Sequence, residues 1–334
     1  MPKISIIIPI YNEEKYIEIC IKSILESDFS KENMEVLLVD GMSVDGTREI
    51  IKHYQTKYSF IKRLDNPKKI APIAMNIGIR KAKGEYIFIL SAHASYDANY
   101  FTALVDYMNK LNADCVGAVL DTDVKNKNAK SNAIKEVLMH PFGVGNASFR
   151  TGTQEITLVD TVAFGCYRKS TFDTYGLFDE KLTRNQDIEL NKRIVNGGGK
   201  IYLIPDVSCT YYARENFIDL AKNNYANGFW NIWTAYYTKS FKSLGLRHFI
   251  PLFFVLSLFL PLLCSLFLKP AFILTLVSLL SYLSLVIIIS LKLKNSSNSM
   301  WYLILAFLTL HLSYGWGSLM GIFSVFNKYI KGSK

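Results

Sequence analysis

Three long apolar segments near the end of the chain constrain its fold more than any other feature of the sequence. They cover residues 249–268, 271–291 and 300–326, and each approaches or exceeds the ~20 residues that a helix needs to cross a bilayer. Only Lys269-Pro270 separates the first two segments, which predicts a tight helical hairpin. A soluble domain rarely holds three such segments so close together. We therefore expect about three transmembrane helices over residues 249–326.

The distribution of charge supports this expectation. Asp219 is the last acidic residue, so the whole formal net charge of +10 lies in the part of the chain after it. A nucleic-acid-binding protein would place such an excess on its folded domain. Here the basic residues flank apolar segments, which is typical of contact with anionic lipid. We expect a lipid bilayer, and no nucleic acid, among the partners of the chain.

An aromatic, basic segment over residues 216–248 precedes the apolar segments. Trp230, Trp233, Tyr236 and Tyr237 are spaced so that they share one face of a helix. Such rings favour the headgroup region of a bilayer, which predicts interfacial amphipathic helices, and an ordinary core helix is the alternative. A basic tail over residues 327–334 closes the chain. Three crossings would place that tail outside, against the positive-inside tendency, so a re-entrant or interfacial segment is a second possibility.

Residues 1–215 alternate between predicted strands and helices. The strands are ISIIIPI (4–10), MEVLLVD (34–40) and EYIFIL (85–90), and amphipathic helical patterns lie between them. This succession predicts an α/β domain with a mainly parallel sheet, right-handed crossovers and flanking helices. The opening segment is too short for the apolar core of a signal peptide, so we expect this domain in the cytoplasm at the cell membrane.

Polar, turn-forming residues follow the first two predicted strands. Pro9, Tyr11 and Glu13 lie at the end of the first strand, and Asp40 ends the second. Because parallel strands present their carboxyl ends at one edge of a sheet, these residues should lie close together. A flat ring could bind beside Tyr11, with Asp40 accepting its N–H group and Glu13 near the ribose.

The sequence as a whole resembles a known family. The segments ISIIIPIYNEEKYI, VLLVDGMSVDGT and NIGIRKAKGEYIFIL look like the front half of a family 2 glycosyltransferase, whose domain has the Rossmann-like GT-A fold. HPFGVGNASFR (140–150), residues 159–194 and HLSYGWGSLMG (311–321) resemble the succinoglycan-type subgroup of bacterial membrane glycosyltransferases. The resemblance covers nearly the whole chain, and its motifs are loose but occur in the family's order.

The resemblance implies roles for particular residues. Nucleotide binding falls on Pro9, Tyr11, Glu13 and Asp40, together with Ser91. The metal motif of the family, two aspartates one residue apart, falls on Ser91 and His93. The acidic pair that holds the catalytic base falls on Gln186 and Asp187, and helix capping is the structural alternative for Asp187. We expect Arg168 and Gln186 to contact the acceptor or a phosphate group.

Ser91 leaves the choice of cofactor open. Enzymes of this fold usually hold Mg²⁺ or Mn²⁺, and serine offers no anionic ligand, whereas the nitrogen of His93 suits Mn²⁺ better than Mg²⁺. One alternative is a weakened or Mn²⁺-preferring site. Another is metal-independent activity supported by nearby cations such as Lys68, Lys69 or Arg168, and a third is an inactive relative.

The resemblance implies an inverting transferase anchored to a membrane. It would move a sugar from a nucleoside diphosphate donor, a UDP-sugar, to a polyprenyl-linked acceptor in exopolysaccharide or capsule-type assembly. Transfer to a bare polyprenyl phosphate is one alternative. A non-catalytic membrane protein that binds nucleotide sugars is another, because Ser91 and Gln186 replace acidic residues of the family motifs.

Overall fold

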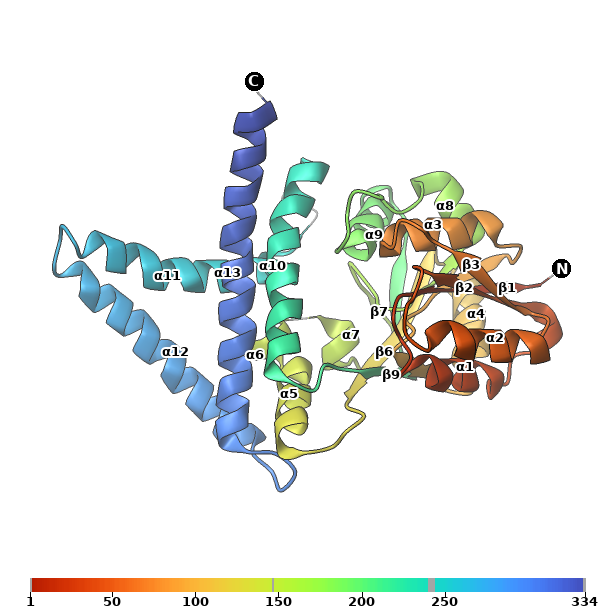
Figure 1. The fold of residues 1–334 in the computed structure, drawn as a ribbon, viewed down its shortest axis with the longest axis horizontal. Coiled ribbons are helices and arrows are strands. Elements are labelled where there is room, and N and C mark those ends of the chain that lie inside the picture. The colour runs from red at the N-terminus through yellow and green to blue at the C-terminus, as the bar shows by residue number, and fades with distance from the viewer. Residues whose placement is uncertain (1, 146, 240–243, 333–334) are drawn as a thin grey trace. The chain divides into compact units, whose positions relative to one another are not determined.

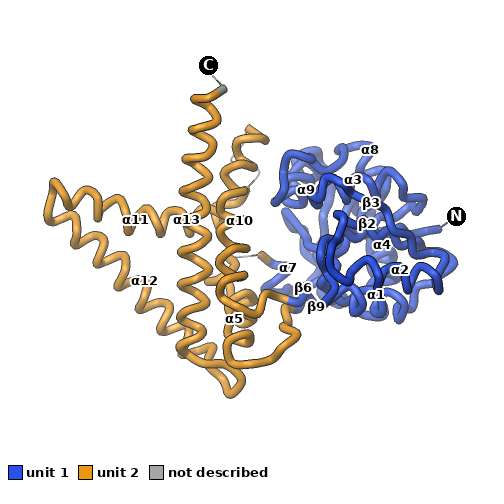
Figure 2. The backbone as a smooth tube through the Cα atoms, viewed as in Figure 1, with its two compact units in different colours: residues 1–121, 148–212 blue, residues 122–147, 213–334 orange. Residues whose placement is uncertain are grey.

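A computed structural model describes residues 2–145, 147–239 and 244–332 of the chain. The chain divides into two compact units, which Figure 2 shows in different colours. Residues 1–121 and 148–212 form the first unit, and residues 122–147 and 213–334 form the second. The first unit contains nearly all of the β-structure, and the second is helical (Figure 1).

The first unit is built on a sheet of mixed direction. Its strands are β1 (Ile4–Ile10), β2 (Met34–Asp40), β3 (Ile61–Asp65), β4 (Tyr86–Ile89), β5 (Ala94–Tyr96), β6 (Cys115–Asp123), β7 (Thr157–Leu158), β8 (Cys166–Arg168) and β9 (Ile201–Tyr212). Its helices are α1 (Ile17–Leu25), α2 (Thr47–Lys57), α3 (Ala71–Lys81), α4 (Tyr100–Lys110), α7 (Ser148–Thr151), α8 (Lys169–Tyr175) and α9 (Gln186–Asn196), with the 3₁₀ turn η1 (Lys31–Asn33).

The strand order explains how the predicted motifs come together. Within the described residues the order is β3-β2-β1-β4-β8-β6-β9-β5, and β7 pairs with β9. The strands β3, β2, β1 and β4 are parallel, whereas β8 pairs antiparallel with β4 and β6, and β9 pairs antiparallel with β5 and β7. The α/β prediction is confirmed, and the parallel part of the sheet is the part that carries β1, β2 and β4.

Helices cover both faces of this sheet (Figure 1). Ile4, Ile6 and Ile8 alternate along β1 and pack against the buried faces of α1, α2 and α4. Ile7 points to the other face, where it packs with buried residues of α3 and α9. The helix α3 lies close to β1 because Gly78 has no side chain, and a methyl group there would collide with Ile7. Two apolar layers thus fix the strand ends that carry the polar loops.

The second unit consists of helices. They are α5 (Ala129–Met139), α6 (Pro141–Val144), α10 (Phe217–Thr238), α11 (Ile250–Cys264), α12 (Ala271–Leu293) and α13 (Met300–Gly332), with the 3₁₀ turn η3 (Leu246–His248). The sequence predicted one continuous domain over residues 1–215, but residues 122–147 belong with the helices. The physical reason is the apolar face of α5, whose Ile134 and Val137 pack into a core with Leu303 and Phe307 of α13.

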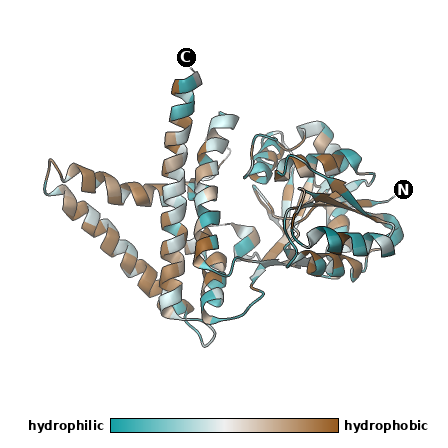
Figure 3. Cartoon of the chain, viewed as in Figure 1, coloured by the Kyte–Doolittle hydropathy of each residue, from teal (hydrophilic) through white to brown (hydrophobic). Residues whose placement is uncertain are grey.

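The apolar segments differ in length from the sequence expectation. Among the described residues, Ala271–Leu293 and Met300–Lys331 are long and apolar enough to cross a membrane, judged by length and composition. The first segment forms the 15-residue helix α11, which contains Pro261 and ends at Cys264. Large exposed apolar side chains are concentrated on α11, α12 and their connection. Figure 3 shows that most residues of α11 and α12 are hydrophobic. The predicted hairpin is present, since Ser257 of α11 hydrogen-bonds Ser278 of α12.

The predicted interfacial segment forms α10, which packs along α13. Gly317 and Gly321 of α13 allow this approach, because a methyl group at either would collide with a backbone carbonyl oxygen of α10. Near the ends of both helices, Nζ of Lys328 lies 4.9–5.4 Å from the ring centroids of Trp233, Tyr236 and Tyr237. Residues 240–243 of this segment and residues 333–334 of the basic tail lie outside the described residues.

Candidate active site

Hydrogen bonds join the loops that follow β1 and β2. The backbone N–H of Asn12 donates to Oγ of Ser43 (2.9 Å), and the N–H of Val44 donates to Oδ1 of Asn12 (2.9 Å). The N–H of Glu13 donates to Oγ1 of Thr47 at 2.9 Å. The two loops therefore form one polar edge, as the sequence predicted from the carboxyl ends of adjacent parallel strands.

Tyr11 and Asp40 have very different exposure on this edge. The side chain of Tyr11 is 46% exposed, and Nζ of Lys69 lies 5.8 Å from the centroid of its ring. Asp40 has no exposed surface. Its carboxylate accepts the N–H of Ser43 (3.1 Å) and lies 2.8 Å from Nε of Arg48. Tyr11 is available to a ligand, whereas Asp40 holds the loop and Arg48 in place and does not offer a free acceptor.

Glu13 connects the first loop to the segment after β4. Its Oε1 lies 3.1 Å from Nδ1 of His93, and both side chains are mostly buried. The ring of His93 also packs edge-on against Tyr211, with 5.2 Å between the centroids. A carboxylate that engages one imidazole nitrogen fixes the ring and leaves the other nitrogen, Nε2, for a ligand.

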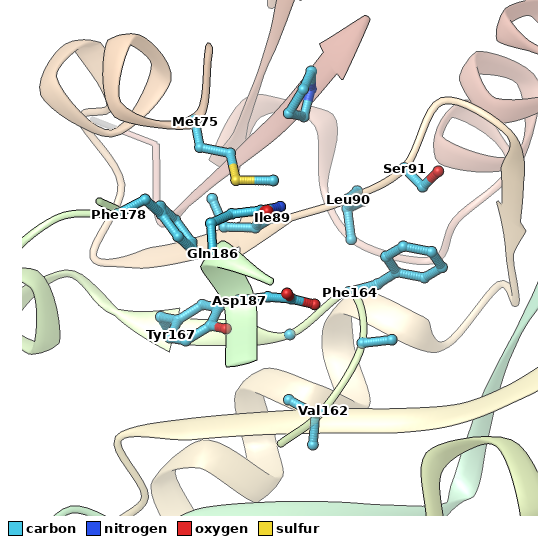
Figure 4. A pocket seen from close by; sticks show the side chains of 13 residues that line it. Met75, Ile89, Leu90, Ser91, Val162, Phe164, Tyr167, Phe178, Gln186 and Asp187 are labelled. Carbon is cyan, nitrogen blue, oxygen red and sulfur yellow. The ribbon is translucent and has the colours of Figure 1, made fainter. Parts of the chain in front are cut away.

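A cavity of about 210 Å³ lies at the carboxyl ends of β1 and β4 (Figure 4). Of the predicted site residues, Pro9, Ser91, Gln186 and Asp187 line it. The remaining walls are largely apolar and come from Met75, Ile89, Leu90, Val162, Ala163, Phe164, Gly165, Tyr167 and Phe178. The cavity thus brings the end of α9 that carries Asp187 to the strand tips after β1 and β4, which lie far from it in the chain.

Asp187 occupies the first turn of α9. Burial raises the pKa of its carboxyl group above the ordinary value. The backbone N–H groups of Ile188 and Asp187 and the charge of Arg150 act in the opposite direction, because they stabilise the carboxylate. Asp187 thus combines the predicted helix-capping environment with a carboxylate that is poorly solvated, and the second property suits a proton acceptor.

Gln186 and Arg168 lie in contrasting places. Gln186 lines the cavity, and its buried Oε1 has no hydrogen-bond partner among the described residues. Arg168 pairs with Tyr86 at the amino end of β4, away from the cavity at the carboxyl end. Its guanidinium donates to the carbonyl oxygens of Ala113 and Met108, both at 3.0 Å. The structure therefore does not bring Arg168 to the other predicted site residues, because its hydrogen bonds join the sheet to the end of α4.

Arg150 was not among the site residues predicted from the sequence. Burial lowers its pKa, and the charge of Asp187 acts in the opposite direction. The sequence also did not point to Tyr211 of β9, whose ring lies 5.2 Å from the guanidinium carbon of Arg150. Residues 140–150 contribute to the resemblance to the succinoglycan-type subgroup, but that resemblance assigns no role to the arginine at their end.

The described residues contain no group of three His, Cys, Asp or Glu side chains that could hold a metal ion. His93 is still suited to act as one ligand, since Glu13 orients its ring and leaves Nε2 available. Ser91 adds no charge beside it. The side chains present fit an ion that takes most of its ligands from a bound diphosphate and solvent.

Comparison with known proteins gives consistent results. A family model described as "Glycosyl transferase family 2" matches residues 5–175. The chain is 32% identical over 233 residues to a dolichyl N-acetyl-alpha-D-glucosaminyl phosphate 3-beta-D-2,3-diacetamido-2,3-dideoxy-beta-D-glucuronosyltransferase of Methanococcus voltae, covering 67% of this chain and 71% of the relative. It is 30% identical over 217 residues to the succinoglycan biosynthesis protein ExoA of Rhizobium meliloti (strain 1021), covering 64% of each.

A solved structure shares the fold. The mannosyltransferase PcManGT from Pyrobaculum calidifontis, in complex with GDP-Man and Mn²⁺, superposes with a TM-score of 0.58 at 16% identity. The match covers 94% of this chain and 87% of that one. At this identity the likeness shows a common GT-A fold, in agreement with the sheet described above.

Proposed function

The chain belongs to glycosyltransferase family 2, and from this premise we propose that it is an inverting enzyme that uses a UDP-sugar and a lipid-linked glycan acceptor. One observation carries the proposal. Asp187, whose carboxyl pKa is raised by burial, lines the same cavity as Pro9 and Ser91 at the carboxyl ends of β1 and β4. A nucleotide bound on the polar edge beside Tyr11 would direct its diphosphate and sugar toward this cavity.

The proposed reaction is a single displacement at the anomeric carbon. The carboxylate of Asp187 takes the proton from an acceptor hydroxyl, and the acceptor oxygen forms a bond to the anomeric carbon. The bond from that carbon to the diphosphate oxygen breaks, and the nucleoside diphosphate leaves with the electron pair. Because the nucleophile and the leaving group lie on opposite faces, the configuration at the anomeric carbon inverts.

In this proposal Tyr11 packs against the base, and Asp40 positions the loop that faces the nucleotide by holding Ser43 and Arg48. Glu13 orients His93, and Gln186 offers its unpartnered Oε1 to a hydroxyl of the sugar or acceptor. When a divalent ion is bound, it would neutralise charge on the leaving diphosphate, with His93 as its ligand from the protein. We propose Mn²⁺ over Mg²⁺ for this position because a nitrogen is the available donor.

The lipid-linked acceptor is supported by two kinds of observation. The relative from Methanococcus voltae is named for transfer to a dolichyl phosphate sugar, and the relative from Rhizobium meliloti for succinoglycan biosynthesis. The second unit also contains two helices long and apolar enough to cross a membrane. We propose that these helices anchor the chain in the cell membrane, with the first unit on the cytoplasmic side, and that the pathway is exopolysaccharide or capsule-type assembly.

One different function has specific support. Ser91 and Gln186 replace acidic residues of the family motifs, and Gln186 leaves a buried oxygen unpartnered. A non-catalytic protein that binds nucleotide sugars would have these features. Turnover separates the two functions, because such a protein would retain the nucleotide and release no transferred sugar.

The test is a transfer assay on the full-length chain in lipid nanodiscs. A panel of labelled UDP- and GDP-sugars is offered with lipid-linked glycan acceptors, and the anomeric configuration of the product is read by NMR. Asp187→Asn should lower the rate by about 10²- to 10⁴-fold and leave UDP affinity unchanged. Asp173→Asn, on the exposed surface of α8, is the matched control. Transfer that survives Asp187→Asn would exclude Asp187 as the base.

A further inference from the structure

Arg150 in α7 is a half-buried cation with an incomplete set of partners. Its Nη1 is buried and has no hydrogen-bond partner within the part of the chain that the structure describes. In that same part, no carboxylate oxygen lies within 4.0 Å of its guanidinium. Burying the Nη1 edge of a guanidinium without a partner costs free energy, so this edge can accept an anion that the protein itself does not supply.

The surroundings of Arg150 place this cation beside the transfer site. Its guanidinium carbon lies 5.6 Å from the ring centroid of Phe149 and 5.2 Å from that of Tyr211. The same Tyr211 ring lies 5.2 Å from the ring of His93. Arg150 is also close enough to Asp187 for each charge to influence the pKa of the other. The guanidinium therefore shares the Tyr211 ring with His93 and is within electrostatic reach of the proposed base.

A comparison with Arg168 argues against a purely structural role. The guanidinium of Arg168 donates to the carbonyl oxygens of Ala113 and Met108 and to Oδ1 of Asn109 (3.4 Å), and its carbon lies 5.8 Å from the ring of Tyr86. Arg150 has the aromatic contacts of such a site but lacks the carbonyl oxygens around Nη1. The aromatic faces hold the guanidinium plane in place, the Tyr211 side chain also interacts with it as a hydrogen-bond partner, and Nη1 is left to donate to a ligand.

We propose that Arg150 binds a phosphate group of a substrate in the transfer site, a role that rests on the proposed function. Phosphate oxygens match the planar fork of a guanidinium, which can donate two parallel hydrogen bonds to them. Two substrates carry such a group: the nucleoside diphosphate, whose charge grows as it leaves, and the lipid-linked acceptor. A fixed positive charge here would help to neutralise the leaving diphosphate. The family motif assigns that task to an ion held by aspartates, and this chain has Ser91 at the first of those positions.

The experiment measures ligand binding separately from turnover. Affinities for UDP and for uridine are determined by calorimetry on the full-length chain in nanodiscs, for the wild type, Arg150→Gln and Arg150→Lys. The KM for the lipid-linked acceptor is determined in parallel. Arg80→Gln is the matched control, because Arg80 is largely exposed and pairs loosely with Glu180 at 3.7 Å. Far-UV circular dichroism and thermal unfolding verify that each variant is folded.

Loss of a charge-assisted pair of hydrogen bonds should weaken binding by about 10- to 100-fold. A loss in UDP affinity of Arg150→Gln, with uridine binding unchanged, assigns the site to the donor diphosphate. Unchanged UDP affinity with a raised KM for the acceptor assigns it to the lipid phosphate. If Arg150→Gln fails to fold, Arg150→Lys decides, because one ammonium group does not reproduce the planar fork.

The proposal is overturned if UDP affinity and acceptor KM are both those of the wild type in a folded Arg150 variant. This outcome is distinct from failure of the proposed function. A chain that binds nucleotides without transferring sugar would still show, through UDP and uridine affinities, whether Arg150 contacts a phosphate.

Discussion

The two halves of the candidate site partner their charges in different ways. On the polar edge formed by the loops after β1 and β2, the buried Asp40 faces Arg48 at 2.8 Å and the N–H of Ser43 at 3.1 Å. In the cavity half, Asp187 has a carboxyl pKa raised by burial, and Gln186 and Arg150 each keep a buried polar atom without a partner. Both halves belong to one rim of the same sheet.

This difference corresponds to two different tasks. A buried charge that faces an opposite charge is held in place before the ligand arrives, and such an edge can bind a nucleotide without rearranging. Charges and polar atoms that lack partners cost stability, and they become useful when a substrate completes their interactions. We therefore expect removal of a charge to destabilise the first half and to stabilise the second.

The largest effect on stability is expected from Asp40→Ala. The change leaves Arg48 with Asp65 as its remaining carboxylate partner and leaves the N–H of Ser43 unpaired, so we expect a loss of about 2–4 kcal/mol in the free energy of unfolding. Asp65→Ala removes the other, half-exposed partner of Arg48 and should cost no more than about 1 kcal/mol. Urea unfolding measures both variants, and equal losses would contradict the proposed difference between the halves.

The opposite sign is expected for Asp187→Asn, which should raise the free energy of unfolding by roughly 0.5–2 kcal/mol at neutral pH. Because the folded-state pKa of Asp187 is raised, its contribution to stability is fully present below the pKa of the unfolded chain and is lost as the pH rises through the folded-state value. The gain of the variant should thus be absent at about pH 3 and constant well above the folded-state pKa.

Thermal unfolding of the wild type and Asp187→Asn over a pH series measures this difference in stability. The neutral amide keeps an oxygen that can accept the N–H groups at the start of α9, so the variant isolates the charge. A variant that is less stable than the wild type at neutral pH would show that the carboxylate is paired in the same way as Asp40.

A smaller effect, on metal binding, is expected in the cavity half. Ser91→Asp places a carboxylate two residues from His93, and we expect Mn²⁺ to bind on the order of tenfold more tightly in the presence of UDP. Electron paramagnetic resonance of free Mn²⁺ gives the affinity without relying on turnover. Ser91→Asn is the matched neutral control. An unchanged affinity in Ser91→Asp would argue against an ion site at the end of β4.

The polar edge was the more predictable half, and its local nature explains why. The apolar segment over residues 4–10 predicts β1, and parallel pairing with β2 then brings Tyr11 and Glu13 to the residues after Asp40. The cavity half needs contacts between segments distant in the chain. The resemblance to the family pointed to Asp187, but neither periodicity nor spacing could show that Arg168 pairs at the amino end of β4 or that the charge of Arg150 acts on Asp187.

The smallest expected effect concerns the pH dependence of transfer, which should reflect the interaction between the charges of Asp187 and Arg150. A base acts as the carboxylate, so kcat/KM should fall as the pH drops through the pKa of Asp187, which burial raises from the ordinary value for aspartate. Arg150 lowers that pKa by stabilising the carboxylate, so Arg150→Gln should move the acid limb to higher pH. At a pH on the acid limb, kcat/KM of Arg150→Gln should fall severalfold more, relative to the wild type, than it falls on the plateau. Arg80→Gln should leave the limb in place. A limb that stays fixed in Arg150→Gln would mean that the two charges do not interact during transfer, and the cavity half would then lack the coupling that distinguishes it from the edge around Asp40.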